Sequence, residues 1–207
     1  MKEILNLKKG ETRQIETSRL LGFVVHGKVS VKPSGNYRSI DCYIEGNKKQ
    51  VLVIWFPTVI ECLSPISQIV WFEFHGSSEF ERGELTIGQP IRIGLTRISL
   101  LELNANQPAK DFEDQGEVEG FIIKGELQIE EFGSPQRPEV YHQGEMFSFN
   151  SLESQIRLSF SGREDALVFL VEQLENPLAL LQGSTSHFYD KLMEVRGRER
   201  AGLKEQD

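Results

Sequence analysis

The sequence contains few of the residues that build metal centres and covalent cross-links. Its 207 residues include two cysteines and four histidines. The cysteines, Cys42 and Cys62, form no C-x-x-C pair, which excludes a zinc ribbon and a thioredoxin-like redox motif. Two isolated cysteines indicate a reduced setting, and a disulfide between them would require an oxidising compartment.

An excess of positive charge is also absent. The formal net charge is −8 and the sequence pI is about 5.2. Because an acidic chain repels phosphate backbones, this composition disfavours general binding of nucleic acid. Long hydrophobic runs are missing too: the most apolar stretch, Val51–Phe56, ends at Pro57, and Met1–Leu7 lacks the apolar core of a signal peptide. We therefore expect a cytoplasmic protein with no membrane segment.

Several short catalytic motifs do not occur. The chain has no G-x-x-x-x-G-K-[ST] phosphate loop, no G-x-G-x-x-G dinucleotide motif, no G-x-S-x-G nucleophile elbow and no H-E-x-x-H zinc motif. The sequence therefore offers none of the local signatures that would identify an enzyme class.

An internal repeat is the main positive signal. The segment Gly22–Glu73, moved forward by 98 residues, aligns without a gap on Gly120–Val171. Seven aligned positions are identical: Gly22/Gly120, Phe23/Phe121, Gly27/Gly125, Gly35/Gly133, Tyr43/Tyr141, Gly46/Gly144 and Val70/Val168. Apolar positions coincide as well, among them Val51 with Phe149 and Trp71 with Phe169. We infer that one β unit is used twice.

Strand patterns dominate both copies. The segment Gln155–Phe160 alternates strictly and places Ile156, Leu158 and Phe160 on one face. Short strands separated by turns that are rich in Gly, Pro, Asn and Ser are typical of an all-β sandwich or barrel. We expect a first β unit in residues 1–84, a second in residues 85–175 and a tail in residues 176–207.

The tail is expected to form a short helix, Ser184–Arg196. Hydroxyl residues precede it as caps, and Phe188, Leu192 and Val195 fall on one helical face. This apolar face either docks on a barrel or mediates self-association into a homo-oligomer.

Two segments of the second copy resemble the motifs of the cupin superfamily of small jelly-roll barrels. Glu113–Leu127 resembles the first motif, in which an H-x-H pair is followed by a glutamate and by an apolar strand that ends in a glycine turn. Tyr141–Phe147 resembles the second motif, a P-x-G-D-like turn followed by a histidine. The resemblance implies an all-β fold of two similar jelly-roll, cupin-like barrels from an internal duplication, plus the short C-terminal helix.

The same resemblance implies a metal site of three histidines and a glutamate, and the sequence departs from it. The H-x-H positions fall on Glu113 and Gln115, the glutamate position on Glu119 and the last histidine position on Phe147. In the first copy the corresponding positions lie near Ile15, Thr17, Leu21 and Lys49. Without imidazole ligands neither copy suits a transition metal, so we expect no metal and no cofactor.

Six residues are candidates for contact with a ligand: Glu113, Gln115, Glu119, His142, Phe147 and Arg157. Arg157 alternates with Ile156 and Leu158, so it points to the opposite face of its strand. If that face lined the barrel, a buried arginine would indicate an anionic ligand; on the outer face it would be solvated.

Three functional hypotheses follow. The first is a metal-free, non-enzymatic tandem cupin that binds a small ligand or a protein partner. The second is a metal-independent isomerase or epimerase with Glu119 and His142 as its acid and base. The third is a pair of OB-type barrels that bind nucleic acid through a basic and aromatic surface of the first copy: Lys28, Lys32, Arg38, Tyr43, Lys48 and Lys49.

Overall fold

The structure is a computed structural model that describes residues 3–16, 19–34, 42–73, 82–113, 116–135, 137–152, 154–162 and 164–174. Within these ranges the chain forms eighteen β-strands and one short 3-10 helix. The four sheets are built from antiparallel strand pairs. The prediction of an all-β chain is confirmed.

The first nine strands form two sheets. The five-stranded sheet has the order β1 (Glu3–Lys8), β8 (Ile66–Glu73), β3 (Leu20–His26), β6 (Gln50–Ile54) and β9 (Arg82–Glu84). The four-stranded sheet has the order β2 (Thr12–Ile15), β7 (Thr58–Cys62), β4 (Lys28–Pro33) and β5 (Cys42–Glu45). The 3-10 turn η1 (Gly46–Lys48) follows β5.

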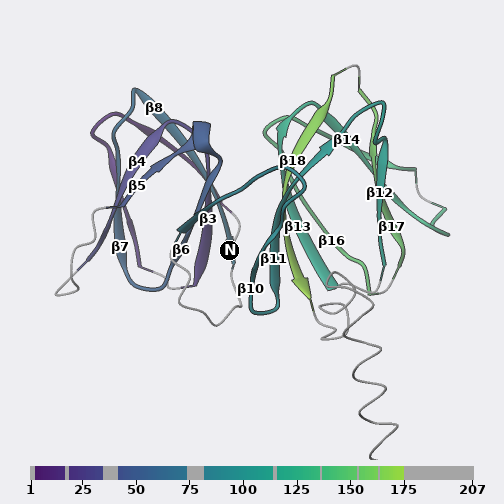
Figure 1. Cartoon of the computed structure of the whole chain (residues 1–207), viewed down its shortest axis with the longest axis horizontal. Helices are drawn as coiled ribbons and strands as arrows, with labels where there is room; N and C mark the ends of the chain where they lie inside the picture. The colour runs from purple at the N-terminus through teal and green to yellow at the C-terminus, as the bar shows by residue number, and fades with distance from the viewer. Residues whose placement is uncertain are drawn as a thin grey trace, which may run out of the picture.

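The last nine strands repeat this plan. The five-stranded sheet has the order β10 (Ile91–Ile93), β11 (Thr96–Leu103), β18 (Ala166–Leu174), β13 (Gly116–Lys124) and β16 (Met146–Asn150). The four-stranded sheet has the order β12 (Ala109–Phe112), β17 (Ile156–Phe160), β14 (Glu126–Glu131) and β15 (Glu139–His142). Figure 1 shows the two sandwiches side by side, and the chain passes from one to the other between β9 and β10.

Three apolar clusters hold the chain together. One fills the first barrel and includes Val24, Ile60 and Trp71. A second fills the second barrel and includes Phe147 and Leu158. The third lies between the barrels, where the two five-stranded sheets pack face to face. Each five-stranded sheet is therefore buried on both faces at its inner strands, which contain apolar runs such as Ile69–Phe72 of β8 and Val168–Val171 of β18.

The barrel interface is centred on aromatic rings. Phe23 of β3 stacks on Phe169 of β18 with ring centroids 4.4 Å apart, and Phe72 of β8 lies 5.3 Å from Phe169. All three side chains are buried. Their burial ties the two barrels into one hydrophobic unit.

Packing explains two pairs of repeated glycines. A Cβ at Gly22 would overlap the ring of Trp71, and a Cβ at Gly120 would overlap the ring of Phe147. In each barrel this glycine, on β3 or on β13, thus leaves room for an aromatic ring to lie against the strand. Gly27 and Gly125 have φ angles of +83° and +78° at the turns that follow β3 and β13, where a residue with a side chain would be strained.

The constant shift of 98 residues is correct only for part of the repeat. Gly22 pairs with Trp71, whereas Gly120 pairs with Leu170, so the counterpart of Trp71 is Leu170 and not Phe169. Gly22 also pairs with Leu52 where Gly120 pairs with Phe147, so Val51 does not correspond to Phe149. The loops between the strands differ in length in the two copies, so the alignment of corresponding strands changes along the repeat. A change by an odd number of residues places a side chain on the other face of its sheet.

The predicted C-terminal helix and its apolar face, Phe188, Leu192 and Val195, lie outside the described residues. Cys62 is free and buried, and the side chain of Cys42 is also outside the description. In the part of the chain that the structure describes, no helix has the length and apolar character to span a bilayer.

Candidate ligand site

The second barrel contains a cavity at one end, which we call the mouth cavity. It measures about 140 Å³ and lies among β14, β15, β16 and β17. Its apolar wall is formed by Ile129, Phe149 and Ile156. Its polar and charged wall is formed by Glu131, Ser134, Arg137, Glu139, Tyr141 and Ser148. Polar and charged side chains thus outnumber the apolar ones in the wall of this cavity.

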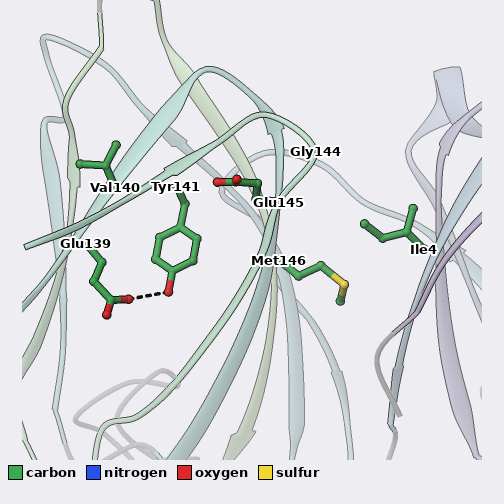
Figure 2. Close-up of a pocket in the computed structure, with 7 residues that line it drawn as sticks. All are labelled: Ile4, Glu139, Val140, Tyr141, Gly144, Glu145 and Met146. Atoms are coloured by element: carbon green, nitrogen blue, oxygen red, sulfur yellow. Dashed lines mark hydrogen bonds between the residues drawn. The ribbon is translucent and has the colours of Figure 1, made fainter.

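Tyr141 and Glu139 form the best-defined polar pair of the mouth cavity. The Tyr141 hydroxyl donates a hydrogen bond to Glu139 Oε2 over 2.6 Å, as Figure 2 shows. This bond, followed by burial and by the charges of Glu139 and Glu145, raises the pKa of Tyr141 to about 12. The phenol therefore keeps its proton at neutral pH and holds the carboxylate in place.

Aromatic rings fill the barrel behind the mouth cavity. Phe149 stacks on Phe147 at 6.2 Å and meets Phe112 edge to face at 5.5 Å. Tyr141 lies 5.6 Å from Phe147. These rings belong to the inner core of the second barrel, so the space that a central ligand would need is occupied.

A second hollow lies where the two barrels meet. It is open, measures about 700 Å³ and lies between Ile4 of β1 and the segment from Glu139 to Met146. Figure 2 shows the side chain of Met146 pointing across it toward Ile4. Glu139 and Tyr141 line both this hollow and the mouth cavity.

The ion pair of Arg97 and Glu172 joins β11 and β18 inside the second barrel. Arg97 donates from Nε to Glu172 Oε1 over 2.9 Å and from its terminal nitrogen to Glu172 Oε2. Glu172 is fully buried and alternates with Leu170 and Val168, which belong to the inner core. Burial lowers the pKa of Lys110 of β12, the charge of Glu172 raises it and the charge of Arg97 lowers it. We call these three residues the charged cluster.

The structure does not bring His142 and Glu119 together. His142 is exposed, and its Nδ1 lies 3.3 Å from Glu126 Oε1 on the outside of the barrel. Glu119 is buried, but it alternates with Val118 of the inner core and lies on the same face of β13 as Phe121 of the barrel interface. The inward position is thus Val118, one residue from the predicted one, and the proposed acid and base face no common cavity.

The first barrel explains the position of His142. Lys28 pairs with Glu45 across β4 and β5, and Glu126 pairs with His142 across β14 and β15. Lys28 Nζ lies 3.0 Å from Glu45 Oε1, so both barrels place a basic and an acidic side chain opposite each other here, with the two residue types exchanged. The counterpart of His142 is therefore Glu45, and not Ile44 as the constant shift of 98 residues would give.

The remaining candidates are dispersed. Arg157 binds Asp111 through two hydrogen bonds of 2.7 and 2.9 Å and lies over the ring of Phe132, on the outer face of the sheet. The hydrogen bond from Arg157 is the main cause of the lowered pKa of Asp111. Glu113 is exposed after β12, and Gln115 lies outside the described residues. Of the five candidates that the structure describes, only Phe147 lies in the inner core, behind the mouth cavity.

The residues present do not fit the metal centre that the sequence resemblance implies. The inward positions beside the expected metal ligands are apolar: Phe112, Val118 and Phe147 in the second barrel, and Ile15, Leu20 and Leu52 in the first. Among the described residues no three side chains of His, Cys, Asp or Glu are grouped as metal ligands would be. These side chains offer a transition metal no coordinating atom.

Sequence analysis missed the residues of both sites. Arg97, Lys110 and Glu172 come from three strands, and Glu139 and Tyr141 from a fourth. The one sequence signal that could have found the charged cluster was a charged residue at an inward position of an otherwise apolar strand. To use this signal, one must know which side chains of each strand point into the barrel, and only the strand pairing shows that.

Comparisons with known proteins identify the fold. No protein-family model matches the chain, and no curated protein matches it. Among solved structures, it is similar to AerE from Microcystis aeruginosa, with a TM-score of 0.68, 12% identity and coverage of 84% of this chain and 87% of that one. Oxalate decarboxylase from Bacillus subtilis matches with a TM-score of 0.62, 10% identity and coverage of 91% and 76%. Ylba from E. coli matches with a TM-score of 0.58, 12% identity and coverage of 83% and 76%.

Proposed function

We propose that this chain, which has a bicupin fold, is a metal-free binding protein that takes a small ligand in the mouth cavity of its second barrel. The resemblance to cupins is confirmed for the fold: the solved structures it matches span both jelly-roll barrels. At 10–12% identity the match supports the fold alone.

One observation carries the proposal. Aromatic and aliphatic side chains fill the inner core of the second barrel, and the mouth cavity lies beside them. A cavity of about 150 Å³ in a protein core can hold benzene, so about 140 Å³ suits a ligand with a body the size of one six-membered ring. The oxygens of the Tyr141–Glu139 pair would accept a hydrogen bond from the ligand at its edge.

The alternatives have less support. The enzyme hypothesis needs Glu119 and His142 across one cavity, and they lie on different faces. The OB-type hypothesis is wrong, because each half is a sandwich of a five-stranded and a four-stranded sheet. Its basic surface is also partly neutralised: Lys28 and Lys48 pair with Glu45, and Lys32 pairs with Glu61.

Titration with phenol tests the proposal. Phenol is expected to shift the methyl signals of Ile129 and Ile156 saturably in a ¹H–¹³C NMR spectrum, while the buried Ile60 of the first barrel stays unchanged. Ile129→Phe fills the cavity and is expected to weaken this binding about tenfold or more, because the ring loses its apolar contact area.

Ile66→Phe is the matched control, since Ile66 is an exposed residue of the first barrel. It should leave the phenol affinity unchanged. A linear, unsaturable shift in the parent protein, or equal affinity in Ile129→Phe, would refute the mouth cavity as a binding site.

A further inference from the structure

We propose that the mouth cavity of the second barrel selects small primary ammonium compounds with an apolar body, and that Glu139 is the main partner of the ammonium group. This inference rests on the proposed function, because it names the chemical class of the ligand for the same cavity. It follows from the charges in the cavity wall, which an uncharged probe such as phenol does not test.

Strand register places both carboxylates of the wall on the inner face of the four-stranded sheet. Glu139 of β15 pairs with Ile129 of β14, which pairs in turn with the core residue Leu158 of β17. Glu131 lies two residues beyond Ile129 on β14 and pairs with the buried Ile156. Directly opposite residues of antiparallel strands lie on the same face of a sheet. Both glutamates therefore share a face with the apolar residues of the wall and the core.

Negative charge exceeds positive charge among the described residues of this wall, where Glu131 and Glu139 are acidic and Arg137 is basic. Glu139 accepts a hydrogen bond from the Tyr141 hydroxyl, and Glu131 accepts one from the Ser154 hydroxyl. Both hydroxyl partners are uncharged, so neither carboxylate is neutralised. Within the part of the chain that the structure describes, no ion pair joins Arg137 to either glutamate.

The free hydrogen-bonding positions of the Tyr141–Glu139 pair favour a donor. The Tyr141 hydroxyl gives its proton to Glu139, so the remaining positions on both groups are acceptors. The pKa of Tyr141, raised to about 12, keeps this proton in place at neutral pH. An ammonium group has three donors and no acceptor, which matches these oxygens. The rings of Tyr141 and Phe149 in the wall add attraction for a cation.

The same charges favour a cation over an anion. A carboxylate ligand could pair with Arg137, but both glutamates would repel it, whereas an ammonium group is attracted to both. All three charged residues are exposed at the mouth, so water screens them and the expected gain in affinity is moderate. The apolar body of the ligand would lie against Ile129 and Phe149.

Benzylamine, benzyl alcohol and benzoate test the preference in the NMR titration used for phenol, because they share one ring and differ in charge. We expect benzylamine to bind about three- to tenfold more tightly than benzyl alcohol, and benzoate to bind more weakly than the alcohol. Glu139→Gln should lower the benzylamine affinity to that of the alcohol. It should leave phenol binding unchanged, because the amide oxygen still accepts the hydrogen bond from Tyr141.

Glu164→Gln is the matched control, because Glu164 is an exposed glutamate of the same barrel that does not line this cavity, and it should keep the benzylamine affinity. Phenol binding and the Tm establish that Glu139→Gln is folded; if it is not, Glu131→Gln replaces it with the same expected loss. Equal affinities of benzylamine and benzyl alcohol in the parent protein would overturn the proposal. So would tighter binding of benzoate, or an unchanged benzylamine affinity in the folded variant.

Phenol separates this inference from the proposed function. Saturable binding of phenol together with equal affinities for the amine and the alcohol would refute the ammonium preference alone. The absence of saturable binding for all four probes would refute the mouth cavity as a binding site, and the ammonium preference with it.

Discussion

Glu172→Gln is expected to lower the free energy of unfolding by about 3–5 kcal/mol, because it removes the charge of the fully buried carboxylate that Arg97 contacts. Glu172 is fully buried and contacts Arg97 through both carboxylate oxygens. The variant also removes the negative charge that supports Lys110. Urea denaturation followed by circular dichroism measures the change.

The chain provides a matched control for this substitution. Asp111→Asn breaks an arginine–carboxylate pair of the same bidentate type, but Asp111 and Arg157 are exposed. Its effect should stay below about 1 kcal/mol. The double variant Arg97→Met/Glu172→Leu removes both charges and should recover most of the lost stability. Equal losses of unfolding free energy in Glu172→Gln and Asp111→Asn would contradict this prediction, because the Arg97–Glu172 pair would then contribute no more than an exposed pair.

Phe169→Ala is expected to destabilise the protein by about 3–5 kcal/mol and to weaken the coupling between the barrels. The ring is fully buried between the two five-stranded sheets and contacts Phe23 and Phe72 of the first barrel. Removing it leaves a cavity at the centre of the interface, which neither sheet can close alone. We expect the single unfolding transition to broaden or to split in two.

Calorimetry combined with tryptophan fluorescence measures this effect. Trp71 lies inside the first barrel, so its fluorescence follows that half of the chain. Phe132→Ala is the control, because Phe132 is an exposed ring of the second barrel, and its effect should stay below about 1 kcal/mol. A sharp single transition with an unchanged Tm in Phe169→Ala would contradict the packing of the two barrels described above.

The sequence predicted the fold where local signals were sufficient. The coincident glycines marked the strands that an aromatic ring crosses and the turns that need positive φ. Strict alternation in Gln155–Phe160 placed Ile156 and Leu158 in the core, and the structure confirms this. Arg157 of the same strand lies on the outer face, which the alternation left open.

The candidate site could not be predicted in the same way. The side chains of a strand can be assigned to the inner or the outer face of a barrel only if the strand register is known. The repeat does not supply that register, because the loops of the two copies differ in length. Glu119 shows the consequence: one residue separates it from the inward Val118, and that step moves it from the barrel interior to the interface. The charged cluster joins residues as far apart as Arg97 and Glu172, which only strand pairing brings together.

Metal content tests most directly the inference that apolar side chains occupy the centres of both barrels. The purified protein is incubated with Mn²⁺, Fe²⁺, Ni²⁺ or Zn²⁺, dialysed, and analysed by mass spectrometry of the elements. We predict less than about 0.1 metal ions per chain and no change in Tm, because the inward side chains provide no imidazole or carboxylate ligand set. One tightly held transition metal ion per barrel would contradict this account.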